Sequence, residues 1–262
     1  MFNSNTLRQR ALVAFLTCVG TLVTFAVVSA QNSPRSPSDT VREFYKAMRE
    51  KRFREAFGMS IYKPALEGLT PDELKDLQPD FEAMAAAIPD KVDLTGEQIS
   101  GDEATVFVKV KESESGGQAE PVSLIRIEGN WIIGDRENQT VVNKAGKSFF
   151  FNARIDTHHQ EAKNMLDRIA LAQLVYGQQH NGQFGDMPSL IAAGLVPKDL
   201  EGTQSTGYRF RVTLSADRKS WTAEAEPAEY GRTGRLSFFM DKNGLKSGDA
   251  GGKPLPATPG NP

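Results

Sequence analysis

The chain has 262 residues, of which 39% are hydrophobic and 24% charged. This length accommodates one or two domains, and the charged fraction is that of an ordinary globular protein. The formal net charge of -2 gives no reason to expect a nucleic-acid partner. A single cysteine excludes a disulfide framework and a thiolate metal site.

The first thirty residues have the pattern of an export segment. Arg8 and Arg10 precede an apolar run over residues 11–28, and small residues at Ser29 and Ala30 end it. This pattern predicts a signal peptide of residues 1–30, cleaved after Ala30. The alternative is a retained membrane anchor formed by residues 11–30, because the apolar run approaches the length that spans a bilayer. Both interpretations place the rest of the chain outside the cytoplasm, in the periplasm or at the cell surface. Contact with the membrane is expected only if the segment stays uncleaved.

Composition divides the remainder into two globular segments. Residues 37–137 hold 13 Lys and Arg against 21 Asp and Glu, a net charge of -8, whereas residues 152–249 hold 12 of each. We therefore predict two domains joined by linkers, and a Gly/Pro-rich tail that is disordered because it offers too few apolar side chains for a core. The predicted boundaries are a linker at 31–37, a first domain at 38–137, a linker at 138–151, a second domain at 152–247 and the tail at 248–262.

The first segment shows helices followed by strands. Apolar residues at helical spacing begin after an N-cap at Ser38 or Asp39, and this pattern breaks near Lys51. Thr70-Pro71-Asp72-Glu73 predicts a helix start with a capping box, and Pro79 is expected to restart that helix. Alternating apolar residues then predict an antiparallel meander over 92–100, 104–110, 122–127 and 131–133. Helices followed by such a meander are typical of an α+β fold.

This first segment resembles the NTF2-like superfamily over about residues 38–137. The resemblance is carried by Val41, Phe44-Tyr45, Ala47 and Ala56 in the helices and by the strand sequences GDEATVFVKV and SLIRIEGNWIIG. It implies a curved antiparallel sheet wrapped around a long helix, which together form a cone enclosing an apolar pocket. Members of the superfamily include small-molecule isomerases, binding modules and accessory domains.

An isomerase of this kind needs a carboxylate base and a hydroxyl group that stabilises an oxyanion. The candidates for the base are Asp80 and Glu82, and those for the hydroxyl are Tyr45 and Tyr62; the segment has no histidine. The alternative is structural, with tyrosines packed in the core and the two acids as solvated helix charges. We favour this alternative and assign no catalytic residue.

The second segment predicts one long helix followed by a small antiparallel sheet. Ala162, Leu166, Ile169 and Tyr176 belong to an apolar stripe with spacings of three and four, which predicts a helix over 152–180. A short helix is expected at 189–193. The predicted strands are 207–212, 221–225 and 235–240, and a tight turn at 241–244 follows the last.

This second segment resembles the globular part of a type IV pilin or of a type II secretion major pseudopilin. The matching residues occur in order with plausible gaps: Ala162, Ile169, Ala172, Tyr176, Asn181-Gly182, Phe184, Leu190, Gly194-Leu195-Val196, Gly207-Tyr208, Ala225-Glu226-Pro227, Tyr230-Gly231, Gly234, Ser237-Phe238, Asp241 and Gly244. The chain departs from that family before the long helix, because residues 146–151 are too few to form the membrane helix of pilins. The resemblance therefore implies a pilin-like head without its membrane helix.

The pseudopilin resemblance also implies a calcium site near the C-terminus. Asp241 and Asn243 offer oxygen ligands, with Asp249 close in sequence. The favoured alternative is a hairpin turn that uses Asp and Asn for its backbone geometry. Adjacent His158 and His159 diverge on a helix, so we expect no metal site there. Apart from this calcium alternative, no cofactor is expected.

Three hypotheses on function follow. The first is an exported, non-enzymatic binding or assembly protein of the bacterial cell envelope, with envelope or secretion-system proteins as partners. The second is a pseudopilin-like accessory component of a type II secretion or type IV pilus system. The third is a small-molecule-binding or isomerase-like enzyme with an NTF2-like fold. A shared fold does not determine a function, so the three hypotheses have to be distinguished by the residues of the functional site.

Overall fold

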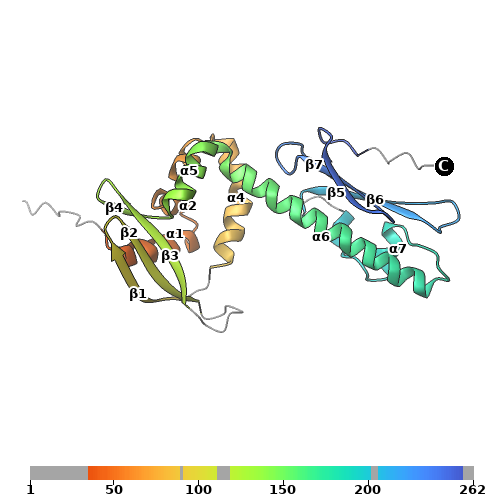
Figure 1. The fold of residues 1–262 in the computed structure, drawn as a ribbon, viewed down its shortest axis with the longest axis horizontal. Coiled ribbons are helices and arrows are strands. Elements are labelled where there is room, and N and C mark those ends of the chain that lie inside the picture. The colour runs from red at the N-terminus through yellow and green to blue at the C-terminus, as the bar shows by residue number, and fades with distance from the viewer. Residues whose placement is uncertain (1–34, 89–90, 111–118, 202–205, 256–262) are drawn as a thin grey trace, which may run out of the picture. The chain divides into compact units, whose positions relative to one another are not determined.

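The protein has an α+β fold with two four-stranded antiparallel sheets. The computed structural model describes residues 35–88, 91–110, 119–201 and 206–255. The expected export segment at 1–30 lies outside these residues, as does the stretch 111–118 between two of the predicted strands. Four helices precede the first sheet in the chain. A long helix leads from the first half to the second sheet (Figure 1).

The N-terminal helices start and stop largely where the sequence predicts. They are α1 (Pro37–Arg49), α2 (Phe53–Gly58), α3 (Lys63–Glu67) and α4 (Pro71–Ala86). The N-cap of α1 is Ser36 and not Ser38 or Asp39 as expected, and its side chain accepts a hydrogen bond from Asp39 N. The predicted break is confirmed at Lys51, which has a positive φ of 57°. The predicted capping box of Thr70 and Glu73 is also confirmed, but α4 continues through Pro79 instead of restarting there.

The first sheet is the predicted meander. It contains β1 (Val92–Ser100), β2 (Glu103–Val110), β3 (Ala119–Ile127) and β4 (Asn130–Ile133), paired in chain order. Glu128 and Gly129 both have positive φ, which matches the twist of a tight hairpin between β3 and β4. The outer edge of β4 pairs with the segment after α2, because Ile61 N donates to Ile133 O and Ile133 N donates to Met59 O, each at 2.9 Å.

The stretch predicted as a linker, residues 138–151, is helical. It contains most of α5 (Arg136–Ala145), the short 3₁₀ helix η1 (Gly146–Ser148) and the first residues of α6 (Phe149–Gln179). Phe150 packs in the aromatic core of the first half, with ring centroids 5.0 Å from Phe81 and 5.2 Å from Phe57. The long helix therefore begins three residues before the predicted start, inside the core of the preceding segment.

The second half packs a sheet against the rest of α6. Its elements are α7 (Met187–Ala192), η2 (Lys198–Glu201), β5 (Tyr208–Leu214), β6 (Trp221–Pro227), β7 (Leu236–Asp241) and β8 (Gly244–Asp249), with the strands paired in chain order. β8 reaches into the stretch predicted to be a disordered tail from residue 248. Beyond it, Ser237 Oγ donates to Lys253 O at 2.7 Å, which ties the following residues to the sheet. Residues 256–262 of the predicted tail lie outside the described chain.

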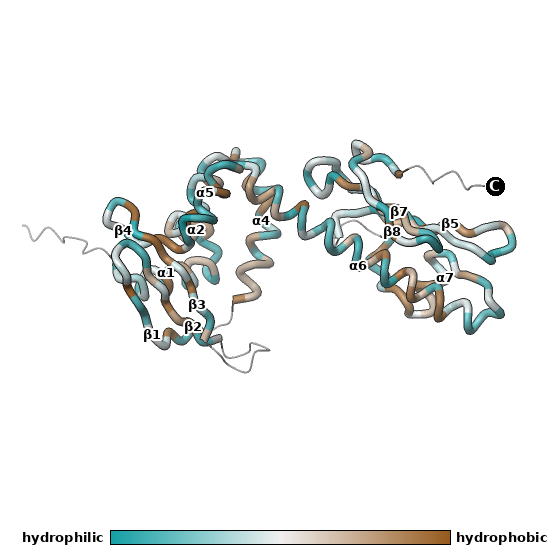
Figure 2. Tube along the Cα trace, in the orientation of Figure 1, coloured by the Kyte–Doolittle hydropathy of each residue, from teal (hydrophilic) through white to brown (hydrophobic). Residues whose placement is uncertain are grey.

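The two halves bury separate cores. The first half holds an aromatic cluster around Phe57, Phe81 and Phe150, and the second is built on Leu166 and Ile169 of α6. In Figure 2 the hydrophobic residues of α6 gather toward its C-terminal half, near α7. None of the helices in the described residues is both long and apolar enough to cross a membrane.

One buried side chain of the second core is polar, and it does not belong to the apolar stripe that the sequence predicts for this helix. Gln173 of α6 is entirely buried, and its amide donates to Gly185 O at 2.7 Å and accepts from Gly185 N at 2.9 Å. Both backbone groups of Gly185 are thereby satisfied at a place where neither sheet nor helix supplies a partner. This contact fixes the chain between α6 and α7.

We expect Gln173→Leu to lower the free energy of unfolding by about 2–3 kcal/mol, because it orphans two buried backbone groups. Urea denaturation followed by far-UV circular dichroism measures the change. Gln178→Leu is the matched control, because Gln178 is exposed on the same helix. Equal effects of the two substitutions would contradict the role assigned to Gln173.

Candidate functional site

The two tyrosines considered for oxyanion stabilisation pack in different clusters. Tyr45 of α1 lies against the core under the first sheet. Tyr62 packs in the aromatic cluster, with its ring centroid 5.2 Å from that of Phe149. Burial raises the pKa of both phenols, so both hydroxyls stay protonated near neutral pH. Each tyrosine is thus a packing residue of its own cluster.

Asp80 is held by an arginine of the long helix. Arg154 of α6 donates to Asp80 through Nη2 at 2.5 Å and to Asp76 through Nη1 at 3.2 Å, and its Nη2 also reaches Asp76 O at 2.7 Å. The Arg154 side chain is only 8% exposed, and Arg232 adds a second ion pair to Asp76. This Asp76–Asp80–Arg154 cluster joins α4 to α6. A carboxylate fixed in this way does not suit a general base, which needs a free lone pair near substrate.

Glu82 points to a different surface of α4. It accepts a hydrogen bond from Gln78 at 3.0 Å and pairs with Lys51 at 3.4 Å. The hydrogen bond from Gln78 and the charge of Lys51 lower the pKa of Glu82. A base at neutral pH needs a raised carboxyl pKa, so this shift has the wrong direction for catalysis. The structure therefore does not bring Tyr45, Tyr62, Asp80 and Glu82 together.

The predicted oxygen ligands at the C-terminus form a hairpin turn. Asp241 accepts from Asn243 N at 2.7 Å and from Asn243 Nδ2 at 3.2 Å, which is the pattern of an Asx turn between β7 and β8. Asp249 lies at the far end of β8 and accepts from the Tyr230 hydroxyl at 3.0 Å. Within the described ranges, no three His, Cys, Asp or Glu side chains form a group that would hold a metal ion.

The paired histidines of α6 join the helix to the loop before β7. His158 Nδ1 lies 2.9 Å from Thr233 O. His159 Nε2 accepts from Arg235 N at 3.1 Å and from Leu236 N at 3.2 Å, so this nitrogen carries no proton. Burial lowers the pKa of His159, with Lys163, Arg235 and His158 acting in the same direction and Asp156 opposing them. These side chains therefore make structural contacts between α6 and the chain at the start of β7.

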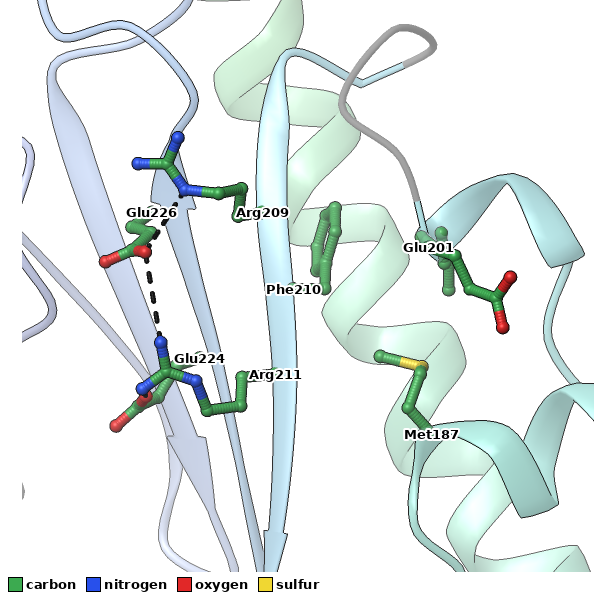
Figure 3. Close-up of a pocket in the computed structure, with 8 residues that line it drawn as sticks. Met187, Glu201, Arg209, Phe210, Arg211, Glu224 and Glu226 are labelled. Carbon is green, nitrogen blue, oxygen red and sulfur yellow. Dashed lines mark hydrogen bonds and ion pairs between the residues drawn. The ribbon is translucent and has the colours of Figure 1, made fainter.

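A groove of about 280 Å³ lies beside β5 in the second half. Its apolar wall is formed by Met187, Leu200 and Phe210, with Glu201 at the rim. Figure 3 shows Phe210 on the Met187 side of β5, whereas Arg209 and Arg211 project from the other side of the strand. The remaining lining residues are Arg209, Arg211, Glu224 and Glu226, so the groove extends around the first strand to both of its faces.

Cross-strand ion pairs cover the outer face of β5 and β6. Arg209 Nε lies 3.3 Å from Glu226, and its other nitrogens donate to Pro227 O and Ala228 O. Arg211 lies 3.4 Å from Glu224 and 4.0 Å from Glu226, and its side chain is 61% exposed. Arg209 is therefore fully engaged with β6, while Arg211 is held loosely.

The sequence did not reveal the most important residues of the Asp76–Asp80–Arg154 cluster or of the cross-strand ion pairs between β5 and β6. Asp76 and Arg154 are 78 positions apart, and no local pattern links them. The alternation Arg209-Phe210-Arg211 against Glu224-Ala225-Glu226 is visible once both stretches are predicted as neighbouring strands. Cross-strand pairing of opposite charges follows from that alternation.

No protein-family model, no curated protein and no solved structure matches this chain. The NTF2-like and pilin-like resemblances accordingly stay predictions.

Replacing both aspartates around Arg154 should destabilise the protein more than replacing the arginine. Asp76→Asn with Asp80→Asn leaves a buried guanidinium unpaired, at a cost of about 3 kcal/mol. Arg154→Met leaves two carboxylates that are each about a third exposed and is expected to cost about 1 kcal/mol. Urea unfolding of the two variants at pH 7 measures the order, and the reverse order would disprove the assignment.

The unfolding free energy should fall as the pH drops from 8 to 5, partly because of His159. Its pKa is lower in the folded state than the ordinary 6.5, so its contribution is fully present above pH 6.5 and is lost as the pH falls through the folded-state value. His159→Gln should flatten this slope in urea titrations, since a carboxamide oxygen still accepts the two N–H groups without titrating. His180→Gln is the control, and an unchanged slope for His159→Gln would contradict the prediction.

Proposed function

We propose that the chain is an exported, non-enzymatic binding or assembly protein of the bacterial cell envelope. The observation that carries this proposal is the use of Asp80, one of the two acids considered as a catalytic base in the first half. It is paired with Arg154 between α4 and α6 and holds the structure together. The lowered pKa of Glu82 also argues against the isomerase-like alternative.

The finer architecture is part of the same proposal. We interpret the first half as an NTF2-like domain, supported by the four helices that precede a meander of four strands. We interpret the second half as a pilin-like head, supported by one long helix packed on a small antiparallel sheet. Both interpretations are compatible with a binding function, in which the first half is a binding module and not an isomerase.

A pseudopilin-like accessory role is the second candidate. It is favoured by the apolar side chains that α6 exposes on the side opposite its core stripe, namely Leu171, Leu174 and Val175. Residues three and four apart on a helix share one face, so these three form a continuous apolar strip. A helical neighbour in an assembly would bury such a strip.

Export is tested by expressing the full chain in a Gram-negative host and fractionating the cells. We expect the chain in the periplasmic fraction, with a mature N-terminus at Gln31 by mass spectrometry. Ala30→Trp should block cleavage and leave the longer chain at the membrane, because the small residue at the -1 position is lost. A full-length chain in the cytoplasmic fraction would contradict the proposal.

A further inference from the structure

The strand β5 forms one border of the second sheet, in the order β5-β6-β7-β8. The register between β5 and β6 determines which N–H and C=O groups of β5 point away from β6. Ser215 N donates to Ser220 O, and Ala228 N donates to Gly207 O, so the pairs 207–228 and 215–220 are hydrogen-bonded pairs. Such pairs alternate along an antiparallel ladder. The odd-numbered residues of β5 therefore bond to β6, and the even-numbered ones direct N–H and C=O away from it.

Three consecutive outward positions are open among the described residues. Tyr208 N donates to Thr206 Oγ1 at 3.3 Å, whereas the outward groups of Phe210, Val212 and Leu214 have no partner in the described part of the chain. An edge of this kind, without proline, lysine or bulge, is a template for another strand. The other edges are different: β4 is paired with Met59 and Ile61, and β1 has a bulge between Leu94 and Gly96. The opposite edge of the second sheet, β8, contains a lysine and two glycines, which make it a poorer template.

The side chains around this edge select against a second copy of β5. Antiparallel self-pairing centred on Phe210 or Arg211 places arginine opposite arginine, and centring on Val212 places the two Arg211 side chains on a diagonal. Like charges at these positions destabilise a strand pair. The strand that β5 already accepts on its other side, β6, carries Glu224-Ala225-Glu226. Charge complementarity therefore favours an acidic strand.

Arg211 and the groove supply side-chain contacts for an added strand, beyond the backbone hydrogen bonds of strand pairing. Arg211 is 61% exposed and holds its two glutamates only at 3.4 and 4.0 Å, so it has donors for a further carboxylate. On the opposite face, Met187, Leu200 and Phe210 line space for the side chain that alternates with those carboxylates. Figure 3 shows the two sets of residues on opposite sides of the strand.

We propose that the outer edge of β5 binds an extended, acidic segment of a partner protein by β-strand addition. The segment carries carboxylates at alternate positions, facing Arg211, and aliphatic side chains between them, facing the groove. This inference rests on the proposed binding function and names its surface and the chemistry of its partner. Backbone hydrogen bonds to Phe210, Val212 and Leu214 supply affinity, and the alternating side chains supply specificity.

The test uses the full chain and a synthetic seven-residue peptide, acetyl-SEVEVES-amide. We expect binding with changed NMR shifts and slowed hydrogen exchange at the amides of Phe210, Val212 and Leu214. The same peptide with lysine in place of each glutamate should bind about ten-fold more weakly, because its charges face Arg211. The acidic peptide N-methylated at both valines should not bind, because it lacks the N–H groups that strand pairing needs.

Two variants connect the binding to Arg211. Arg211→Ser should weaken the acidic peptide about three-fold, the size of an exposed ion pair, and Arg211→Glu should reverse the preference toward the lysine peptide. Arg42→Glu is the matched control, because Arg42 is equally exposed at 62% on α1. Equal binding of acidic and basic peptides, equal effects of the Arg42 and Arg211 substitutions, or shifts confined to residues outside β5 would each overturn the proposal. These outcomes are independent of export, which is measured by fractionation.

Discussion

Phe150 and Leu166 lie on the same helix but are buried in different cores. This continuity of α6 is the constraint on which the rest of the described structure depends. A helix of 31 residues has no break at which the second half can turn away from the first without losing backbone hydrogen bonds. The aromatic cluster fixes the first residues of the helix, and the second sheet covers the middle and later part. One continuous helix thereby contributes side chains to two hydrophobic cores.

Polar residues in this protein are used to secure that helix along its length. Arg154 ties its beginning to α4, His158 and His159 tie the following turns to the loop before β7, and Gln173 ties its later part to Gly185. Each contact satisfies backbone or charged groups that burial would otherwise leave unpaired. The same residue types that serve as acids, bases and ligands in enzymes are here engaged in structure. This distribution supports a binding role over catalysis.

Much of the fold was predictable because it depends on local patterns. The capping box at Thr70, the strand alternation from Ala104 and the apolar stripe through Leu166 each identify one element. The misplaced boundaries came from longer-range effects. Phe150 belongs to a core formed by distant helices, so its stretch resembled a linker when taken alone. β8 contains two glycines and was not predicted as a strand, and its last two residues were assigned to the tail, because pairing with β7 compensates a weak strand propensity.

The candidate site was harder to predict because its main components are backbone groups. The sequence of residues 208–214 does not show that this strand lies at the edge of a sheet. Its edge position depends on the order of all four strands. Arginines on an edge strand also prevent unwanted pairing, since charged side chains are a common protection against aggregation. The two roles are compatible, because arginines repel a second β5 and attract an acidic strand. Protection against self-association and recognition of a partner therefore follow from the same positive charges on β5. Arg211 is less engaged with β6 than Arg209 is, so a substitution of Arg211 can separate the two roles.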